Sequence, residues 1–163
     1  MRLHSQVLPD AIVRNTRLPR TLVTTTIRHL KEAGRIPRGY RHAPPLSPRD
    51  LARIILGLSA MSPTAAVEHE RAVGRLPLAE GDGEATAEDA LVAIIRGATP
   101  HEEAANGKVL IGQITPIVEI RAGQDSVIYR TRQPRGAQVT FTISTHAIRA
   151  MAHALLQDEN VQI

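Results

Sequence analysis

Apolar residues recur at helical spacing in residues 20–33. At about 100° per residue, one arc of this segment holds apolar side chains and a single threonine. That arc consists of Leu22, Val23, Thr26, Ile27, Leu30 and Ala33. The opposite arc carries hydroxyls and charges, namely Arg20, Thr21, Thr24, Thr25, Arg28, Lys31 and Glu32. The pattern predicts an amphipathic helix with one buried face and one solvated face.

Proline and glycine mark the ends of this helix. Pro19 suits the first turn, where its missing N–H would have no helical partner, and Gly34 suits a left-handed stop. A shorter apolar pattern over residues 8–17, with Pro9 in the first turn, predicts a supporting helix before it. Residues 16–19 would then form the turn of a helix-turn-helix. The alternative for the shorter segment is a frayed N-terminal arm.

Two serine-proline pairs predict further helix starts. Ser47 lies at a cap position, and Asp50 follows three residues later, as in a capping box with Asp in place of Glu. The same start signal recurs at Ser62. Downstream, residues 77–85 are polar and rich in glycine, which is typical of a linker. We therefore expect a helical helix-turn-helix domain over residues 1–76, followed by a linker.

The period changes from helical to two in the last third of the chain. A short helix capped by Thr86 comes first. Alternation then predicts a three-stranded antiparallel meander, with strands at residues 114–121, 127–131 and 138–143 and a hairpin turn at 122–125. Ser144 or Thr145 would cap a last helix. We expect residues 86–163 to form a second domain for oligomerisation or effector binding, its sheet flanked by helices, so that the fold class is α+β.

Composition narrows the classes of function. The chain has 163 residues, of which 42% are hydrophobic, enough for one domain or two small ones. It has no cysteine, which excludes disulfides, thiolate zinc sites and cysteine nucleophiles. Aromatic residues make up only 2%, which disfavours base stacking on single strands. No secretory signal and no run of roughly 18 apolar residues is visible, so we expect a cytoplasmic protein without membrane contact.

Charge is distributed unevenly along the chain. Residues 1–60 hold 11 Lys+Arg and 3 Asp+Glu, a net charge of +8. Residues 61–163 hold 9 and 13, a net charge of −4. A basic first part joined to an acidic remainder indicates a polyanionic partner for the first part.

The segment after the amphipathic helix is basic and cannot be helical. Residues 35–47 contain four helix-breaking prolines and glycines. Arginines around Tyr40 favour an extended arm that follows a phosphate backbone or enters a minor groove, and a plain interhelical linker is the alternative. With the helix, this arm completes the expected DNA-contacting set: Arg17, Arg20, Thr21, Thr24, Thr25, Arg28, Lys31, Arg35, Arg38, Tyr40 and Arg41.

The sequence gives little support for a metal-binding or catalytic site. The seven histidines lack the usual metal-ligand spacings, and no nucleophile-elbow, phosphate-loop or dinucleotide motif occurs. Glu68 and Glu70 are expected to be solvated charges. We therefore expect no enzyme activity, no metal and no cofactor.

The block of residues 18–58 resembles small helix-turn-helix proteins of proteobacterial prophages and mobile elements. The most specific parts are His29-Leu30-Lys31-Glu32-Ala33-Gly34 and Ser47-Pro48-Arg49-Asp50-Leu51-Ala52. Where those proteins have a run of Gly and Arg between the two helices, this chain has PRGYRHAPP. The resemblance implies a DNA-binding regulator.

Three hypotheses follow for function. The first is a sequence-specific double-stranded DNA-binding protein, a transcriptional regulator of phage or mobile-element origin that acts as a homodimer or higher homo-oligomer. The second is an oligomeric phage component, such as a small terminase-like packaging subunit, whose C-terminal part builds a ring. The third is an interaction module whose basic face meets an acidic protein, without DNA.

Overall fold

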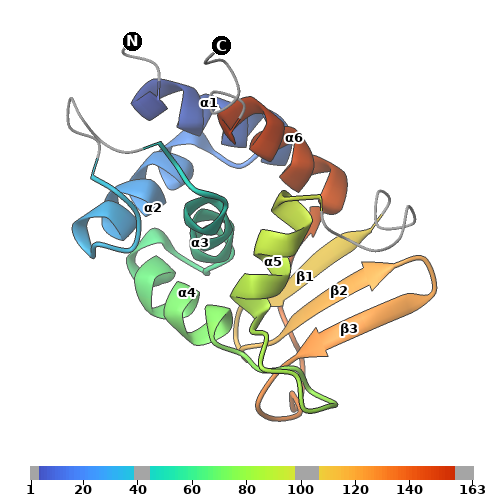
Figure 1. The fold of residues 1–163 in the computed structure, drawn as a ribbon. Helices are drawn as coiled ribbons and strands as arrows, with labels where there is room; N and C mark the ends of the chain where they lie inside the picture. The colour runs from blue at the N-terminus through green and yellow to red at the C-terminus, as the bar shows by residue number, and fades with distance from the viewer. Residues whose placement is uncertain (1–3, 39–44, 98–106, 157–163) are drawn as a thin grey trace.

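The computed structural model describes residues 4–38, 45–97 and 107–156 (Figure 1). The N-terminal helices are α1 (His4–Thr16), α2 (Arg20–Glu32), α3 (Pro48–Leu58) and α4 (Ala66–Gly74), the last preceded by a 3₁₀ turn, η1 (Pro63–Ala65). Helix α5 (Ala87–Ile95) leads to strands β1 (Lys108–Gly112), β2 (Val118–Ala122), β3 (Asp125–Tyr129) and β4 (Thr140–Ser144), and helix α6 (Thr145–Leu156) follows. No helix in the described ranges combines the length and apolar character needed to span a membrane. The overall class is α+β, as predicted.

Capping boxes open two of the helices. At the start of α3, the Ser47 hydroxyl accepts from the Asp50 amide at 3.1 Å, and the Asp50 carboxylate accepts from the Ser47 amide at 2.8 Å. Thr86 and Asp89 form the same reciprocal pair at the start of α5. Both satisfy amide groups that would otherwise lack a partner at a helix N-terminus. The predicted cap at Ser47 and the predicted start at Thr86 are thus confirmed.

Helices α1 and α2 are joined by the short turn of residues 17–19. Helix α1 begins a turn earlier than expected, so that Pro9 lies inside it rather than in its first turn. Arg17 takes a left-handed backbone conformation with φ 59°, which redirects the chain between the helices. Helix α2 begins directly after Pro19, as predicted.

The sheet has four strands rather than the predicted three, in the order β3-β2-β1-β4, with every neighbouring pair antiparallel. The strand missed by the sequence is β1, and β4 pairs with it instead of continuing a sequential meander. Strand β1 is central and carries three consecutive apolar residues, so it lacks the alternation that marks a half-buried strand. Ile114, expected in a strand, lies in the β1–β2 loop and is 57% exposed.

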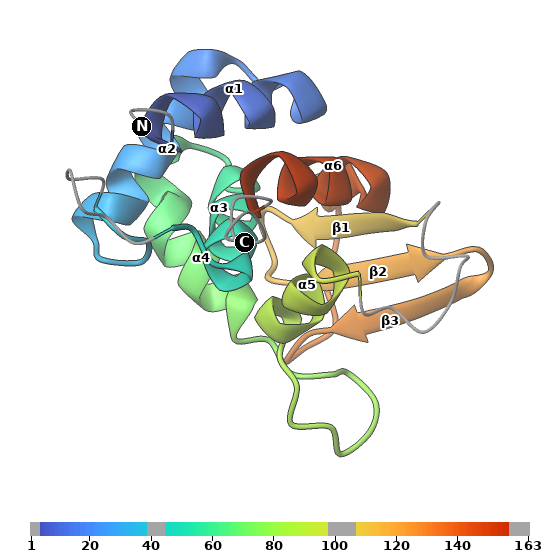
Figure 2. The same cartoon turned by 45° about the horizontal axis from the view of Figure 1, so that its top comes forward.

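One face of the sheet belongs to the protein core. The register and the two-residue side-chain period place alternate residues on this face, and the following five are buried there: Val109, Ile111, Val118, Tyr129 and Ile143. Figure 2 shows α6 lying over this sheet, with α1 stacked beyond it. The hairpin turn predicted at 122–125 is confirmed, since Ala122 pairs with Asp125 across it.

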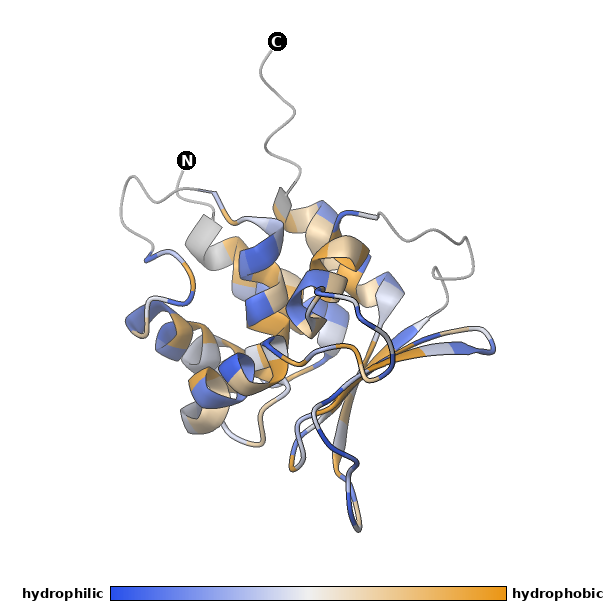
Figure 3. Cartoon of the chain, turned by 60° about the horizontal axis from the view of Figure 1, so that its bottom comes forward, coloured by the Kyte–Doolittle hydropathy of each residue, from blue (hydrophilic) through white to orange (hydrophobic). Residues whose placement is uncertain are grey.

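A single apolar cluster joins the two halves of the chain. It includes Ile12 of α1, Leu51 of α3, Leu91 of α5 and Met151 of α6, all fully buried. Figure 3 shows the apolar positions gathered between the helices and against the sheet. The segment expected to be a linker runs along β3: the Ala79 amide donates to the Ile128 carbonyl at 2.8 Å. The boundary expected at residues 77–85 therefore does not separate two cores.

Candidate functional site

Helix α2 is held against the core by one face only. Its buried residues are Val23, Thr26, Ile27 and Leu30, four of the six members of the predicted apolar arc. Of the other two, Leu22 is half-buried and Ala33 is exposed. A glycine on α3 makes room for this contact, because a Cβ at Gly57 would lie 3.0 Å from the Leu30 Cδ1 atom. The packing fixes the direction in which the opposite face of α2 points.

That opposite face is open to solvent and polar. The exposed residues of the predicted DNA-contacting set on α2 and the preceding turn are Arg17, Arg20, Thr21, Thr24 and Arg28. Thr25 and Lys31 are half-buried at the margins of this face. Arg14, in the last turn of α1, is also exposed and adds a cation that is not part of the predicted set. We call these eight residues the α2 face.

Two of the cations on the α2 face lie beside carboxylates. Arg20 pairs with Asp10 of α1, and Arg28 lies 3.8 Å from the Glu32 carboxylate one turn away. All four side chains are at least half exposed, so these pairs are screened by water and contribute little to stability. The Thr24 hydroxyl donates to the Arg20 carbonyl at 3.0 Å within its own helix. The face is therefore cationic, with its two exposed ion pairs weak enough to exchange partners.

Arg38 extends this cationic surface past the end of α2. Its guanidinium donates to the carbonyls of Lys31 and Glu32 at 3.2 and 3.0 Å. These carbonyls lie in the last turn, where a helix has no intrahelical donors left for them. The contact positions an exposed positive charge next to the α2 face. Tyr40 and Arg41, the other predicted arm residues, lie outside the described residues.

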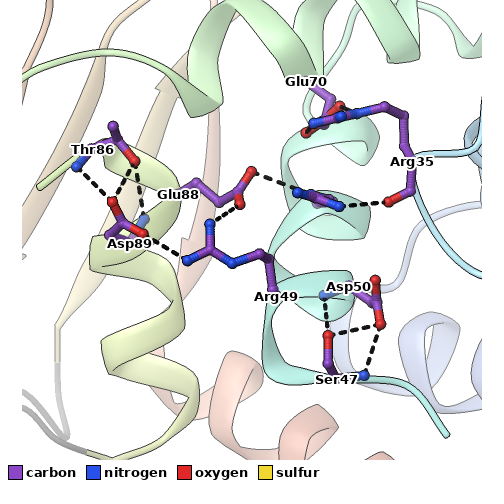
Figure 4. Close-up of polar contacts among 9 residues, drawn as sticks. Arg35, Ser47, Arg49, Asp50, Glu70, Thr86, Glu88 and Asp89 are labelled. Carbon is purple, nitrogen blue, oxygen red and sulfur yellow. Dashed lines mark hydrogen bonds and ion pairs between the residues drawn. The ribbon is translucent and has the colours of Figure 1, made fainter.

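Arg35 points away from this surface into the protein. Its guanidinium donates to both carboxylate oxygens of Glu70, at 2.7 and 2.9 Å (Figure 4). This hydrogen bonding raises the pKa of Arg35 despite the opposing effect of its partial burial. Glu70 is fully buried, so the expectation that it is a solvated charge is wrong. Among the described members of the predicted set, Arg35 is thus the one whose guanidinium pairs with a buried carboxylate.

A second group of ion pairs connects α3 to α5. Arg49 contacts Glu88 at 2.5 Å and Asp89 at 2.9 Å (Figure 4). Arg53 lies 3.4 Å from Glu88. The hydrogen bonds that Arg49 donates to Asp89 and, second, to Glu88 raise the pKa of Arg49. Hydrogen bonds from Thr86, and more weakly from Arg49, lower the pKa of Asp89. Acidic residues of the C-terminal half therefore neutralise arginines of the N-terminal half.

These ion pairs neutralise part of the positive charge that the sequence concentrates in residues 1–60. Arg35, Arg49 and Arg53 contribute to the +8 of residues 1–60, yet each is paired with an acid from beyond residue 60. Part of the asymmetry is therefore internal to the fold. Among the described residues of this first part, the cations that remain available to a polyanion are those of the α2 face together with Arg38.

Other site chemistry is sparse. Burial lowers the pKa of His69, whose Nε2 lies 2.9 Å from the Ser59 hydroxyl inside the helical layer. In the parts of the chain that the structure describes, no three His, Asp or Glu side chains gather in a way that could hold a metal ion. Comparisons with protein-family models, with curated proteins and with solved structures find no match to this chain.

Proposed function

We propose that the protein binds double-stranded DNA through the α2 face and acts as a homo-oligomeric transcriptional regulator of phage or mobile-element origin. The observation that carries the proposal is a helix with two distinct faces. One face of α2 is buried against α3, and the other offers only hydroxyls and charged groups to solvent. Such groups contact phosphates and base edges in known DNA-binding helices.

The chemistry of the α2 face can be divided between base edges and phosphates. Thr21, Thr24 and Arg28 occupy its middle, at helical spacings of three and four residues. An arginine can donate two hydrogen bonds to guanine in the major groove, which admits an α-helix. Arg14 and Arg17 lie before the helix and would contact phosphates on the flanks.

The existing ion pairs do not oppose this function. Exposed pairs such as Arg28 with Glu32 are typically worth less than about 1 kcal/mol. A bidentate contact with guanine is worth about 1–3 kcal/mol of discrimination, so Arg28 would gain by exchanging its partner.

Replacing Arg28 with Ala tests the proposal. We expect the variant to lose about 1–3 kcal/mol of affinity for a DNA site selected from random duplexes, and to lose preference at one base pair. Arg71→Ala is the matched control, because Arg71 is an exposed helical arginine on α4, outside the α2 face. Fluorescence anisotropy of labelled duplexes at two salt concentrations measures both variants.

Two outcomes would contradict the proposal. One is wild-type protein that shows no salt-dependent binding to any duplex, since phosphate contacts always bring salt dependence. The other is equal loss of affinity in the Arg28→Ala and Arg71→Ala variants, which would mean that general charge rather than the α2 face determines binding.

A further inference from the structure

The two edges of the sheet differ in how they are covered. At the β3 edge, the chain near residue 78 pairs with the strand: Ala79 donates to Ile128, and Arg130 donates to Pro77. At the β4 edge, no described segment makes a backbone hydrogen bond to the outer side of the strand. Edge strands with unpaired backbone groups are templates for pairing with another chain.

The direction of the backbone groups in β4 follows from two hydrogen bonds. Gln113 donates to the Val139 carbonyl at 2.8 Å, and Thr145 donates to the Gly107 carbonyl at 3.0 Å. Because bonded pairs alternate in an antiparallel ladder, the odd-numbered residues of this segment bond to β1. Thr140, Thr142 and Ser144 therefore direct their backbone groups outward.

The sequence of β4 lacks two of the usual protections of a free edge, charge and proline. The strand reads Thr-Phe-Thr-Ile-Ser, without the charges or prolines that natural proteins place on free edges. A groove of about 380 Å³ runs beside it, lined by all five β4 residues and by Asn15, Thr16 and Leu18. An added strand lies about 4.8 Å from its neighbour, so it would occupy this groove.

We propose that a second copy of this chain occupies the β4 edge, with the two β4 strands antiparallel about a two-fold axis through Thr142. In this register Thr142 faces itself, Thr140 faces Ser144 of the second copy, and Phe141 faces Ile143. Hydroxyl side chains meet on the outer face, and an aromatic meets a β-branched residue on the inner face. The inference deepens the proposed function, since it rests on the homo-oligomer proposed there and names its interface, and its test does not depend on DNA.

The register uses the outward backbone groups. The two Thr142 residues exchange a pair of hydrogen bonds, and each Ser144 amide donates to the Thr140 carbonyl of the other copy. The Ser144 carbonyl is not used between the two copies and remains available to α6. The Ser144 hydroxyl caps the first turn of α6 by accepting a hydrogen bond from the Ala147 amide at 3.1 Å. Val139 is 45% exposed beside this edge and would be covered by the second copy.

The self-complementary register favours a second copy over a foreign peptide. A two-fold axis needs one patch that matches itself, and β4 satisfies this condition in both its side-chain pairs and its backbone groups. The β4 residues carry no charge that would select a partner of opposite sign. Docking of an extended peptide from another protein is therefore an outcome that the test must distinguish.

Charged residues at position 142, which lies on the proposed two-fold axis, test the proposal. Thr142→Lys and Thr142→Asp each put like charges opposite one another, so each variant alone should dissociate at a concentration about tenfold or more above that of the wild type. A mixture of the two variants should restore the dimer. Ser126→Lys and Ser126→Asp, at an exposed position of β3, are matched controls that should stay dimeric. Light scattering measures the mass, and circular dichroism confirms that each variant is folded.

Thr142→Pro provides an independent variant. It removes an outward N–H while leaving the hydrogen bonds to β1 intact, so it should give a folded monomer. A monomeric wild type, a Thr142→Lys dimer as tight as the wild type, or a mixture that stays monomeric would overturn the proposal. A monomeric wild type that binds an extended peptide at β4 would assign the edge to another protein and overturn it as well.

Discussion

Glu70 has no contact with solvent, and both of its carboxylate oxygens accept hydrogen bonds from Arg35. Burying an isolated carboxylate would cost far more than a folded domain can supply, so the arginine is required for Glu70 to lie there. The pair also fixes where the chain runs after α2. A residue expected to contact phosphate thus anchors the segment that leads away from the α2 face.

Arg35 and Arg38 should therefore respond differently to replacement. We expect Arg35→Ala to lower the free energy of unfolding by about 3–5 kcal/mol, because it leaves a buried carboxylate unpaired. Arg38→Ala removes only exposed hydrogen bonds and should cost less than about 1 kcal/mol. Urea unfolding followed by circular dichroism measures both, and equal losses would show that the Glu70 pair is not structural.

The spacing of residues in α4 indicated that Glu70 is buried, although its residue type indicated the opposite. Glu70 lies four residues after Ala66 and three before Val73, on the buried arc of α4. Helical periodicity therefore favoured a buried position, whereas residue type alone favoured solvent. The identity of the partner could not be predicted, because Arg35 is distant in sequence and the pairing depends on how α4 packs.

At the scale of elements, the β1–β2 connection depends on one glycine. A Cβ at Gly112 would lie 2.4 Å from the Thr115 carbonyl oxygen and 2.6 Å from the Ile117 side chain. The Gly112 amide also donates to the Ile117 carbonyl at 2.9 Å, which closes the loop tightly. The chain can reverse at this point because residue 112 has no side chain.

Gly112→Ala should therefore destabilise the protein by about 1–3 kcal/mol, the usual cost of overpacking a tight site. Gly83→Ala is a suitable control, since a Cβ there would meet only the Leu78 side chain at 3.6 Å. The control should change stability by less than about 0.5 kcal/mol. Thermal unfolding of both variants decides the matter, and a Gly112→Ala protein as stable as the wild type would contradict the proposed role.

Elements with local signals were predictable, and those that depend on distant pairing were not. The starts of α2, α3 and α5 follow from proline and capping residues close by in the sequence. The two faces of α2 follow from periodicity, so most of the candidate site was predictable too. Strand β1 carries no alternation, and its pairing with β4 bridges more than twenty residues, which no local pattern reveals.

At the scale of the whole molecule, the two predicted domains share one core. Helices α1 and α3 of the first half pack against α6 and α5 of the second, and ion pairs from Arg49 and Arg53 cross between the halves. The polar composition of residues 77–85 indicated a boundary. That composition reflects exposure of the segment, and a segment can be exposed without separating two folding units.

Neither half should fold alone. A fragment of residues 1–76 would expose the apolar faces of α1 and α3, and a fragment of residues 86–163 would lose the helices that cover α5 and α6. We expect both fragments to lack a cooperative thermal transition, and the full chain to unfold in one step. Calorimetry on the three proteins measures this. A cooperative transition in the fragment of residues 86–163 would restore the two-domain division.

The packing of α1 against α6 also has a consequence for synthesis. Helix α1 ends at Thr16 and α6 begins at Thr145, so the ribosome must add about 130 residues between them. At about 5–20 residues per second, α1 waits roughly 6–26 seconds for α6, one of the helices that it packs against. Because transiently exposed apolar surface promotes aggregation, we expect the nascent chain to depend most on chaperones during this interval. A product truncated before α6 would lack this packing partner of α1, and α2 in turn packs against α1. We therefore expect such a product to lose the DNA binding that we propose for the α2 face.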